Sequence, residues 1–218
     1  MIEKSKVGLI FQKFNTMIQN QFQPKIRVFW SDNALEYFDT NQGSYLKSQG
    51  IVHQSSCVDT PQQNGVSEGK NRHLLEVAKS IMFTMNVPKH FWGKAILTST
   101  YLINRMPSKT LQFQTPFQKL IRVYPNTQIM STLPPKIFGC TTFVHIHQHN
   151  RSKLKPKANK CLPLGYSPTQ KGYKCHSLAT KKFYVTLDVT FFKNQPFFIK
   201  NNIQGENTRM WFLVSRSS

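Results

Sequence analysis

Two of the chain's nine acidic residues stand where their side chains could act together on a metal ion. Asp32 follows residues 26–30, whose alternating pattern is typical of a half-buried strand, and Ser31-Asp32-Asn33 predicts the turn that ends it. Glu68 stands near the start of a long helical pattern. A carboxylate at a strand end and another on a helix can converge on divalent metal, which brings an attacking oxygen and a phosphate together for in-line displacement. The pair therefore indicates phosphoryl-transfer chemistry.

Each carboxylate also has a purely structural interpretation. An Asp in the place of Asp32 commonly closes a turn by bonding its own backbone. Glu68 in a first helical turn is stabilised by about 0.3–1 kcal/mol through the helix dipole, without a fixed partner. Two carboxylates can hold one Mg²⁺ that keeps its waters, whereas two metals about 3.5–4 Å apart need several carboxylate oxygens. Descent from a metal-dependent enzyme and present catalytic activity of this chain are therefore separate questions.

A motif between the two carboxylates makes the pattern specific. The stretch Thr60-Pro61-Gln62-Gln63-Asn64-Gly65-Val66, with Ser31-Asp32-Asn33 and Glu36-Tyr37, resembles the integrase core of copia-type LTR retrotransposon polyproteins. The resemblance continues through residues 138–140, 164–173 and 188–192, and it covers nearly the whole chain to about Phe198. Ala34-Leu35 and Gly69 depart from the family pattern, which has glycines and an arginine at those places.

The resemblance implies a polynucleotidyl transferase in which Asp32 and Glu68 are catalytic and metal-binding residues and Mg²⁺ or Mn²⁺ is a weakly bound cofactor. Enzymes of this kind use three carboxylates, and the family places the first Asp on a strand upstream of the segment that matches Met1. We therefore expect an integrase fragment whose ancestral activity is metal-dependent DNA strand transfer and which is inactive here. The resemblance also implies DNA as partner, homo-oligomers and an intracellular, nuclear location.

The charge of the chain favours a polyanionic partner. Lys and Arg number 29 against 9 Asp and Glu, a formal net charge of +20. Such an excess attracts nucleic acid first and an anionic membrane surface second. A non-enzymatic nucleic-acid-binding module is therefore the alternative function, and a protein-interaction module is a third. The candidate nucleic-acid-binding residues are Asn64, Lys70, Arg72, Arg151, Lys153, Lys155 and Lys157.

Several of these side chains have competing interpretations. Arg72 lies four residues after Glu68, so the two could form an ion pair on one helix face instead of an Arg72–phosphate contact. The basic stretch 151–157 could be a solvated loop instead of a phosphate site. Alternating His145, His147 and His149 predict an exposed strand face more than a zinc site. Tyr166, Tyr173 and Phe183 are either core residues or a base-stacking surface.

The remaining composition excludes several classes of protein. The four cysteines form no C-x-x-C pair, which favours reduced thiols over a disulfide framework. No apolar run of about 18 residues predicts a membrane span, and no signal-peptide pattern follows Met1.

Hydrophobic periodicity predicts the elements that would position the carboxylates. Helical spacing predicts a helix from Val7 to Phe22, one at Thr40–Leu46, one carrying Glu68 to about Met85, one from Pro88 to Met106 and a short one at Phe117–Leu120. Strands are predicted at 26–30 and 51–53, and the polar stretch 55–64 predicts a mobile loop. Four later strands are predicted at 138–146, 161–166, 173–177 and 183–189.

The predicted fold class is α/β: a truncated RNase H-like integrase core followed by a small all-β SH3-like barrel. The predicted domains are the core at 1–123, a proline-containing linker at 124–135, the barrel at 136–200 and a disordered tail at 201–218. The truncated sheet would leave the strand ending at Asp32 with an exposed edge.

Overall fold

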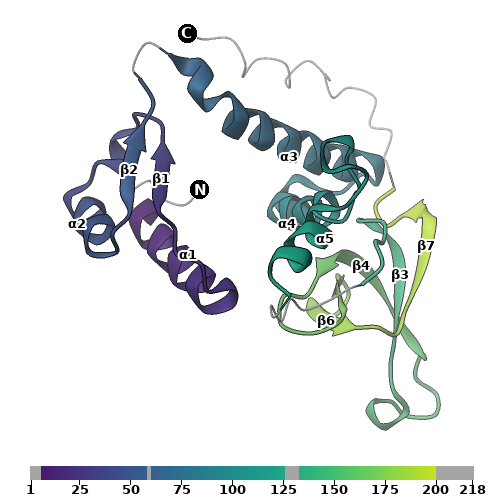
Figure 1. Ribbon diagram of the computed structural model, residues 1–218. Helices are drawn as coiled ribbons and strands as arrows, with labels where there is room; N and C mark the ends of the chain where they lie inside the picture. The colour runs from purple at the N-terminus through teal and green to yellow at the C-terminus, as the bar shows by residue number, and fades with distance from the viewer. Residues whose placement is uncertain (1–5, 58–59, 126–132, 200–218) are drawn as a thin grey trace.

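The computed structural model describes residues 6–57, 60–125 and 133–199 (Figure 1). The tail 201–218 and most of the predicted linker, residues 126–132, lie outside the described residues. The order is α1 (Val7–Phe22), β1 (Val28–Ser31), η2 (Leu35–Tyr37), α2 (Thr40–Ser48), β2 (Val52–Ser55), η3 (Pro61–Asn64), α3 (Gly65–Thr84), η4 (Lys89–Phe91), α4 (Trp92–Ile103), η5 (Lys109–Leu111), α5 (Pro116–Val123), β3 (Cys140–His145), η6 (Gln148–Asn150), β4 (Ala158–Tyr166), β5 (Tyr173–Ser177), β6 (Lys182–Thr186) and β7 (Val189–Pro196).

The first unit is a small α/β layer. Strands β1 and β2 pair in parallel, with Val28 opposite Val52 and Ser31 opposite Ser55. Aromatic side chains join the sheet to α1, since the rings of Phe11 and Phe29 are 4.5 Å apart. Parallel strands place their carboxyl ends at one edge, where ligands bind in open α/β sheets. Strand β1 begins two residues later than predicted and β2 begins one residue later, because the flanking apolar residues 26 and 51 lie outside the paired register.

The opposite face of this two-stranded sheet is uncovered. Val28, Trp30 and Val52 are 48%, 51% and 55% exposed. Period-two alternation predicts which side chains share a face, and one face is indeed packed against α1 and α2. The other face has no covering layer in the part of the chain that the structure describes.

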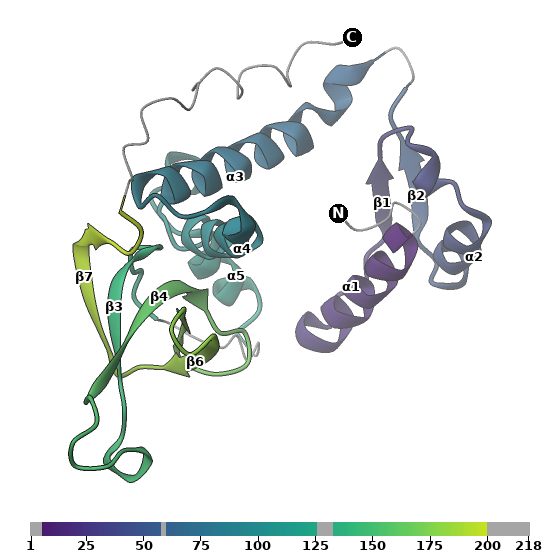
Figure 2. The same ribbon diagram turned by 180° about the vertical axis from the view of Figure 1, so that it is seen from behind.

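The second unit is a five-stranded antiparallel sheet in the order β6-β5-β4-β3-β7, with α3, α4 and α5 beside it (Figures 1 and 2). The sequence predicts one strand at 183–189, but the structure divides that region into β6 and β7. The chain turns at Leu187 and Asp188, where Asp188 N–H donates to Thr186 Oγ1 at 3.0 Å. Strand β7 then pairs with β3 at the opposite end of the strand order.

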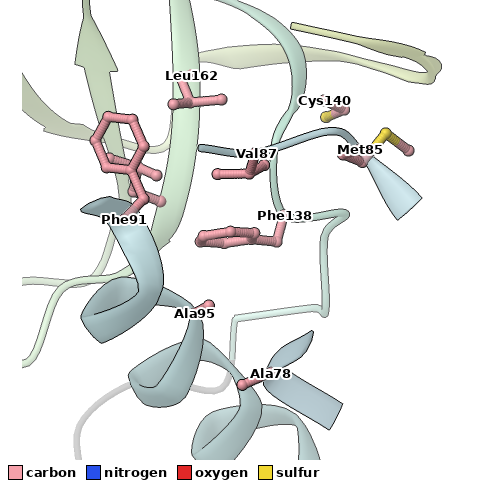
Figure 3. Close-up of a cluster of buried hydrophobic side chains, with 9 residues drawn as sticks. Ala78, Met85, Val87, Phe91, Ala95, Phe138, Cys140 and Leu162 are labelled. Carbon is pink, nitrogen blue, oxygen red and sulfur yellow. The ribbon is translucent and has the colours of Figure 1, made fainter. Parts of the chain in front are cut away.

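A single buried cluster joins the helices to this sheet (Figure 3). Its largest members come from the α3–α4 connection, η4 and the barrel strands, and they include Val87, Phe91, Phe138 and Leu162. The small Ala95 on α4 is completely buried, which lets the helix approach its neighbours closely. Removing a large buried side chain such as Leu162 from a core of this kind typically costs about 2–5 kcal/mol.

Helical spacing of Val66, residues 73–74, 77–78, Ile81 and Met85 predicts a buried side along the whole of α3, and in the amino-terminal half this prediction is wrong. Residues 65–73 are all exposed, and Val66 is 74% exposed. Buried contacts begin only near Ala78, which is 4% exposed. The apolar spacing continues through Val66 and His73, but no element packs there in the described structure. Within the predicted loop at 55–64, Ser55 is the last residue of β2 and Pro61–Asn64 form the 3-10 turn η3.

Three cysteines in the barrel core provide a test of the packing. Cys140, Cys161 and Cys175 are fully buried, while Cys57 is exposed. Burial raises the pKa of Cys140 and Cys161 to about 11 and that of Cys175 to about 12. Because the thiolate is the nucleophile, iodoacetamide at about pH 8 is expected to modify the folded chain once and the denatured chain four times. Mass spectrometry measures the adducts, and Cys57→Ser is expected to abolish the native adduct. Rapid native modification of Cys175 would contradict the packing.

Candidate active site and nucleic-acid interface

Asp32 begins the loop that leaves the carboxyl end of β1. Its side chain is exposed, and Oδ1 accepts a hydrogen bond from Ala34 N–H at 3.1 Å. This is the turn that the sequence predicts, and it orients the carboxylate. Burial raises the pKa of the nearby Tyr37 phenol, and the negative charges of Asp32 and Glu36 raise it further.

A histidine of the neighbouring strand β2, His53, is hydrogen-bonded to the end of β1. Ser31 Oγ lies 2.8 Å from the carbonyl oxygen of Asp32 and 2.8 Å from His53 Nε2. If the single hydroxyl proton goes to the carbonyl, His53 donates from Nε2 to the serine oxygen. The imidazole also lies 5.3 Å and 5.1 Å, centroid to centroid, from the rings of Phe29 and Phe38. Sequence reasoning missed His53, since a lone histidine on a short strand carries no motif.

Ser56 connects the two segments that carry the carboxylates. Its N–H donates to Ser31 O at 3.1 Å, and its hydroxyl donates to Asn64 Oδ1 at 2.8 Å. Asn64 precedes the first residue of α3. The carboxyl end of β1 and the amino end of α3 consequently lie at the same end of the sheet (Figures 1 and 2). Asn64 was predicted to bind nucleic acid, and the structure engages its amide oxygen in this internal bond.

Glu68, Lys70 and Arg72 lie on the exposed half of α3. The ion pair between Glu68 and Arg72, one of the two alternatives for these side chains, does not form, since no salt bridge joins them among the described residues. Both charges therefore face solvent. This arrangement leaves Lys70 and Arg72 accessible to an external phosphate and Glu68 accessible to a metal ion.

The donor set suits one divalent cation better than two. Asp32 follows the carboxyl end of β1 and Glu68 lies in the first turn of α3, and each offers hard carboxylate oxygens. Mg²⁺ can bind through one or two carboxylates while keeping several waters. Within the described ranges, no three His, Cys, Asp or Glu side chains are grouped so that they could hold a metal ion. A two-metal centre needs more oxygen ligands than this pair supplies.

The predicted basic stretch lies in the loop between β3 and β4. This loop projects away from the helices at the far end of the barrel (Figure 1). Lys153, Lys155 and Lys157 are exposed, and Arg151 is half-buried with its Nε in no hydrogen bond among the described residues. Lys155 N–H donates to Ser152 O at 3.1 Å, which shapes the turn. The side chains therefore form an exposed cationic tip.

The three alternating histidines lie at the base of this loop. The prediction of one strand face is wrong, because β3 ends at His145 and the 3-10 turn η6 follows His147. The rings still gather, with centroids 5.6 Å apart for His145 and His147 and 5.9 Å apart for His147 and His149. His147 Nε2 is 3.4 Å from Asp188 Oδ2, and both side chains are more than half exposed.

Tyr166, Tyr173 and Phe183 were predicted to be either core residues or a base-stacking surface, and the structure separates them. Tyr173 is 5% exposed and belongs to the barrel core, while Phe183 is 51% exposed and stacks on His176. The Tyr166 ring is partly buried and stacks on Tyr101 of α4 with centroids 3.5 Å apart. Tyr166 and Tyr173 therefore hold the barrel together, and they do not form an open base-stacking surface.

Comparison with known proteins identifies relatives for both units. Residues 140–205 match the family of retroviral polymerase SH3-like domains. This match and the strand topology confirm the predicted α/β part followed by a small all-β SH3-like domain. Within the described residues, no helix has the length and apolar character needed to span a bilayer.

The curated relatives are transposon polyproteins. The chain is 36% identical over 192 residues to the retrovirus-related Pol polyprotein from transposon RE1 of Arabidopsis thaliana, covering 88% of this chain and 13% of the relative. For the corresponding protein from transposon TNT 1-94 of Nicotiana tabacum, the identity is 37% over 188 residues, covering 86% of this chain and 14% of the relative. The chain thus spans about one seventh to one eighth of these proteins.

Solved structures with a similar course of the chain are viral integrases. The HTLV-2 integrase catalytic core domain in complex with magnesium has a TM-score of 0.38 and 15% identity, covering 50% of this chain and 65% of that chain. A simian T-cell lymphotropic virus intasome in complex with a PP2A regulatory subunit has a TM-score of 0.42 and 13% identity, covering 84% and 63%.

Proposed function

Because the chain is a relative of the copia-type LTR retrotransposon Pol polyproteins, we propose that it is an integrase-region segment that binds DNA through exposed basic side chains. The observation that carries the proposal is the cationic tip of the β3–β4 loop, where three lysines are exposed on a domain that matches the retroviral SH3-like family. The exposed half of α3 supplies a second cationic surface through Lys70 and Arg72.

The binding is electrostatic and weakly dependent on base sequence. Both surfaces place cationic side chains at exposed points, on a loop in one case and on the first turns of a helix in the other. Contacts to phosphate fix the position of a protein on the duplex but carry little sequence information. A formal charge of +20 adds long-range attraction, which increases the rate of encounter with DNA.

Asp32 and Glu68 are the residues that would hold Mg²⁺ or Mn²⁺. A bound divalent ion would supply neutralisation of phosphate charge at this edge of the sheet. The residues of the chain contribute the rest: Ala34 N–H orients the Asp32 carboxylate, and the Ser56 bonds hold the start of α3 against the end of β1. Lys70 and Arg72 would then attract the DNA strand toward the carboxylates.

The ancestral reaction of this site is DNA strand transfer, and we propose that the 218-residue chain does not perform it alone. The purified chain is expected to bind oligonucleotides that carry element ends but neither to nick nor to join them with Mg²⁺ or Mn²⁺, because two carboxylates neutralise a metal pair poorly. A gel-based strand-transfer assay measures the products. Metal-dependent joining that disappears in both Asp32→Asn and Glu68→Gln would overturn this proposal and show that another group completes the site.

The relationship to Pol polyproteins also supports proposals about the cellular setting. A chain that acts on chromosomal DNA would act in the nucleus, and integrase relatives that form multimers make self-association a reasonable expectation. Sedimentation of the purified chain and imaging of a tagged copy test these two proposals separately.

A further inference from the structure

A groove lies between α4 and the barrel, away from the two carboxylates. Its volume is about 470 Å³. Helix α4 contributes Lys94, Leu97 and Tyr101 to its lining, and the barrel contributes Tyr166 and Lys174. The two walls are in close contact, because a Cβ added to Gly165 of β4 would lie 2.6 Å from Thr98 Oγ1 of α4.

Internal contacts hold the inner wall in place. The Tyr101 and Tyr166 rings are stacked at an interplanar angle of 14°. Tyr101 donates its hydroxyl proton to Leu133 O at 2.6 Å, and Tyr166 accepts from Lys136 N–H at 2.9 Å. Arg105 lies 3.5 Å from the Tyr101 ring centroid and adds positive charge beside the groove. The groove is therefore organised before any ligand binds.

The charge around the groove has one sign. Lys94, Arg105 and Lys174 line it, and no acidic residue does so in the part of the chain that the structure describes. The sequence extends this asymmetry, since residues 77–187 contain 17 Lys and Arg and no Asp or Glu. A ligand of this groove is consequently an anion, because a cationic groove walled by low-dielectric protein concentrates negative ligands.

The apolar part of the groove lining indicates which class of anion the groove binds. Leu97 is 65% exposed and lines the groove together with Lys94 and Lys174. A volume of this size accommodates nucleotide units, whereas a duplex is far too wide to enter it. Single-stranded nucleic acid presents apolar base faces and phosphates together, and grooves that bind it combine positive charge with aromatic side chains. In this groove the Tyr101 and Tyr166 rings stack on each other, and Leu97 is the exposed apolar side chain.

The groove also has room for a chain of several nucleotides. Asn104 and Arg105 are shared with a neighbouring cavity of about 460 Å³, which Phe22 and Leu120 also line. We propose that this groove binds single-stranded nucleic acid, with bases on Leu97 and phosphates on Lys94 and Lys174. The proposal rests on the nucleic-acid-binding function above and adds a second, strand-selective site to it.

Fluorescence anisotropy with a labelled oligothymidylate of about 12 nucleotides tests the groove. Leu97→Glu places a negative charge at an exposed position and is expected to weaken strand binding about tenfold, equivalent to about 1.4 kcal/mol. Phe83→Glu is the matched control, because Phe83 is also helical and is 66% exposed.

The double variant Lys94→Gln/Lys174→Gln tests the phosphate contacts. It is expected to make the dependence of log K on log salt shallower by about 1.4, at about 0.7 per single-strand phosphate. Its control is Lys79→Gln/Lys181→Gln, at two exposed lysines.

A duplex of the same sequence, tested in parallel, separates the groove from the general basic surface. The groove is supported if the Leu97→Glu and Lys94/Lys174 variants lose strand affinity while duplex affinity is unchanged. It is overturned if the groove variants and their controls behave alike, or if the unmodified chain binds duplex but not the oligothymidylate. Failure of the unmodified chain to bind duplex would overturn the proposed function instead. An oligouridylate arm shows whether the site distinguishes RNA from DNA.

Discussion

Raising the salt concentration from about 50 mM to about 200 mM is expected to weaken binding of this chain to duplex DNA by about a thousandfold or more, if it neutralises at least six phosphates. Each Lys or Arg that contacts a phosphate releases condensed counterions, and salt opposes that release. Filter binding on a duplex across a salt series measures the slope of log K against log salt. A flat dependence would remove nucleic acid as the main partner.

The β3–β4 loop is expected to account for a large part of this slope. Replacing its four basic residues with Gln should reduce the slope by about 0.9 for each phosphate that the chain no longer neutralises, hence by up to about 3.6. These residues are Arg151, Lys153, Lys155 and Lys157.

A matched control variant separates local binding by the loop from the effect of net charge. The first unit offers one exposed Arg and three exposed Lys, namely Lys13, Lys25, Arg27 and Lys47. Replacing these four with Gln changes the net charge by the same amount but removes no residue of the cationic tip. Equal slopes for the two variants would mean that total charge, and not the loop, determines the binding.

Gly139→Ala is expected to destabilise the chain by about 2–5 kcal/mol. Gly139 has φ +81°, which costs a non-glycine residue about 1–2 kcal/mol. A Cβ at this position would overlap Val87 Cγ2 and approach Met85 Cβ to 2.9 Å, and overpacking of a core typically costs about 1–3 kcal/mol. The backbone has little freedom to retreat, because Gly139 N–H donates to Pro163 O and its carbonyl accepts from Phe197 N–H.

Urea denaturation followed by circular dichroism measures this loss of stability, and Gly69→Ala is its control. An added Cβ at Gly69 meets nothing within 4 Å, and the residue is exposed inside α3. Alanine there is expected to stabilise the helix by up to about 0.8–1.0 kcal/mol, because glycine is the poorer helix former. If both variants changed the midpoint in the same direction by similar amounts, the packing around Gly139 would be wrongly placed.

Local pattern was sufficient for the long elements and for the family relationship. Helix α1 was predicted with its observed bounds, and β5 likewise, because repeated apolar spacing and flanking breakers act within a short window of sequence. The turn at Asp32 was also predicted, since an Asp side chain bonds a backbone N–H only two residues away. The relationship to copia-type Pol proteins is likewise a property of residue types in order, and comparison confirms it.

Contacts between distant segments were decided only by the tertiary structure. Strand β7 was missed because a turn of two residues separates it from β6, while its partner β3 lies far back in the sequence. The exposure of Val66 depends on whether another element covers α3, and helical periodicity carries no information about that. The bonds from Ser56 and His53 that hold the two carboxylate-bearing segments, and the groove between α4 and the barrel, arise from packing of separate elements. The sequence gives the chemical type of each side chain, but tertiary packing determines which other residues that side chain contacts.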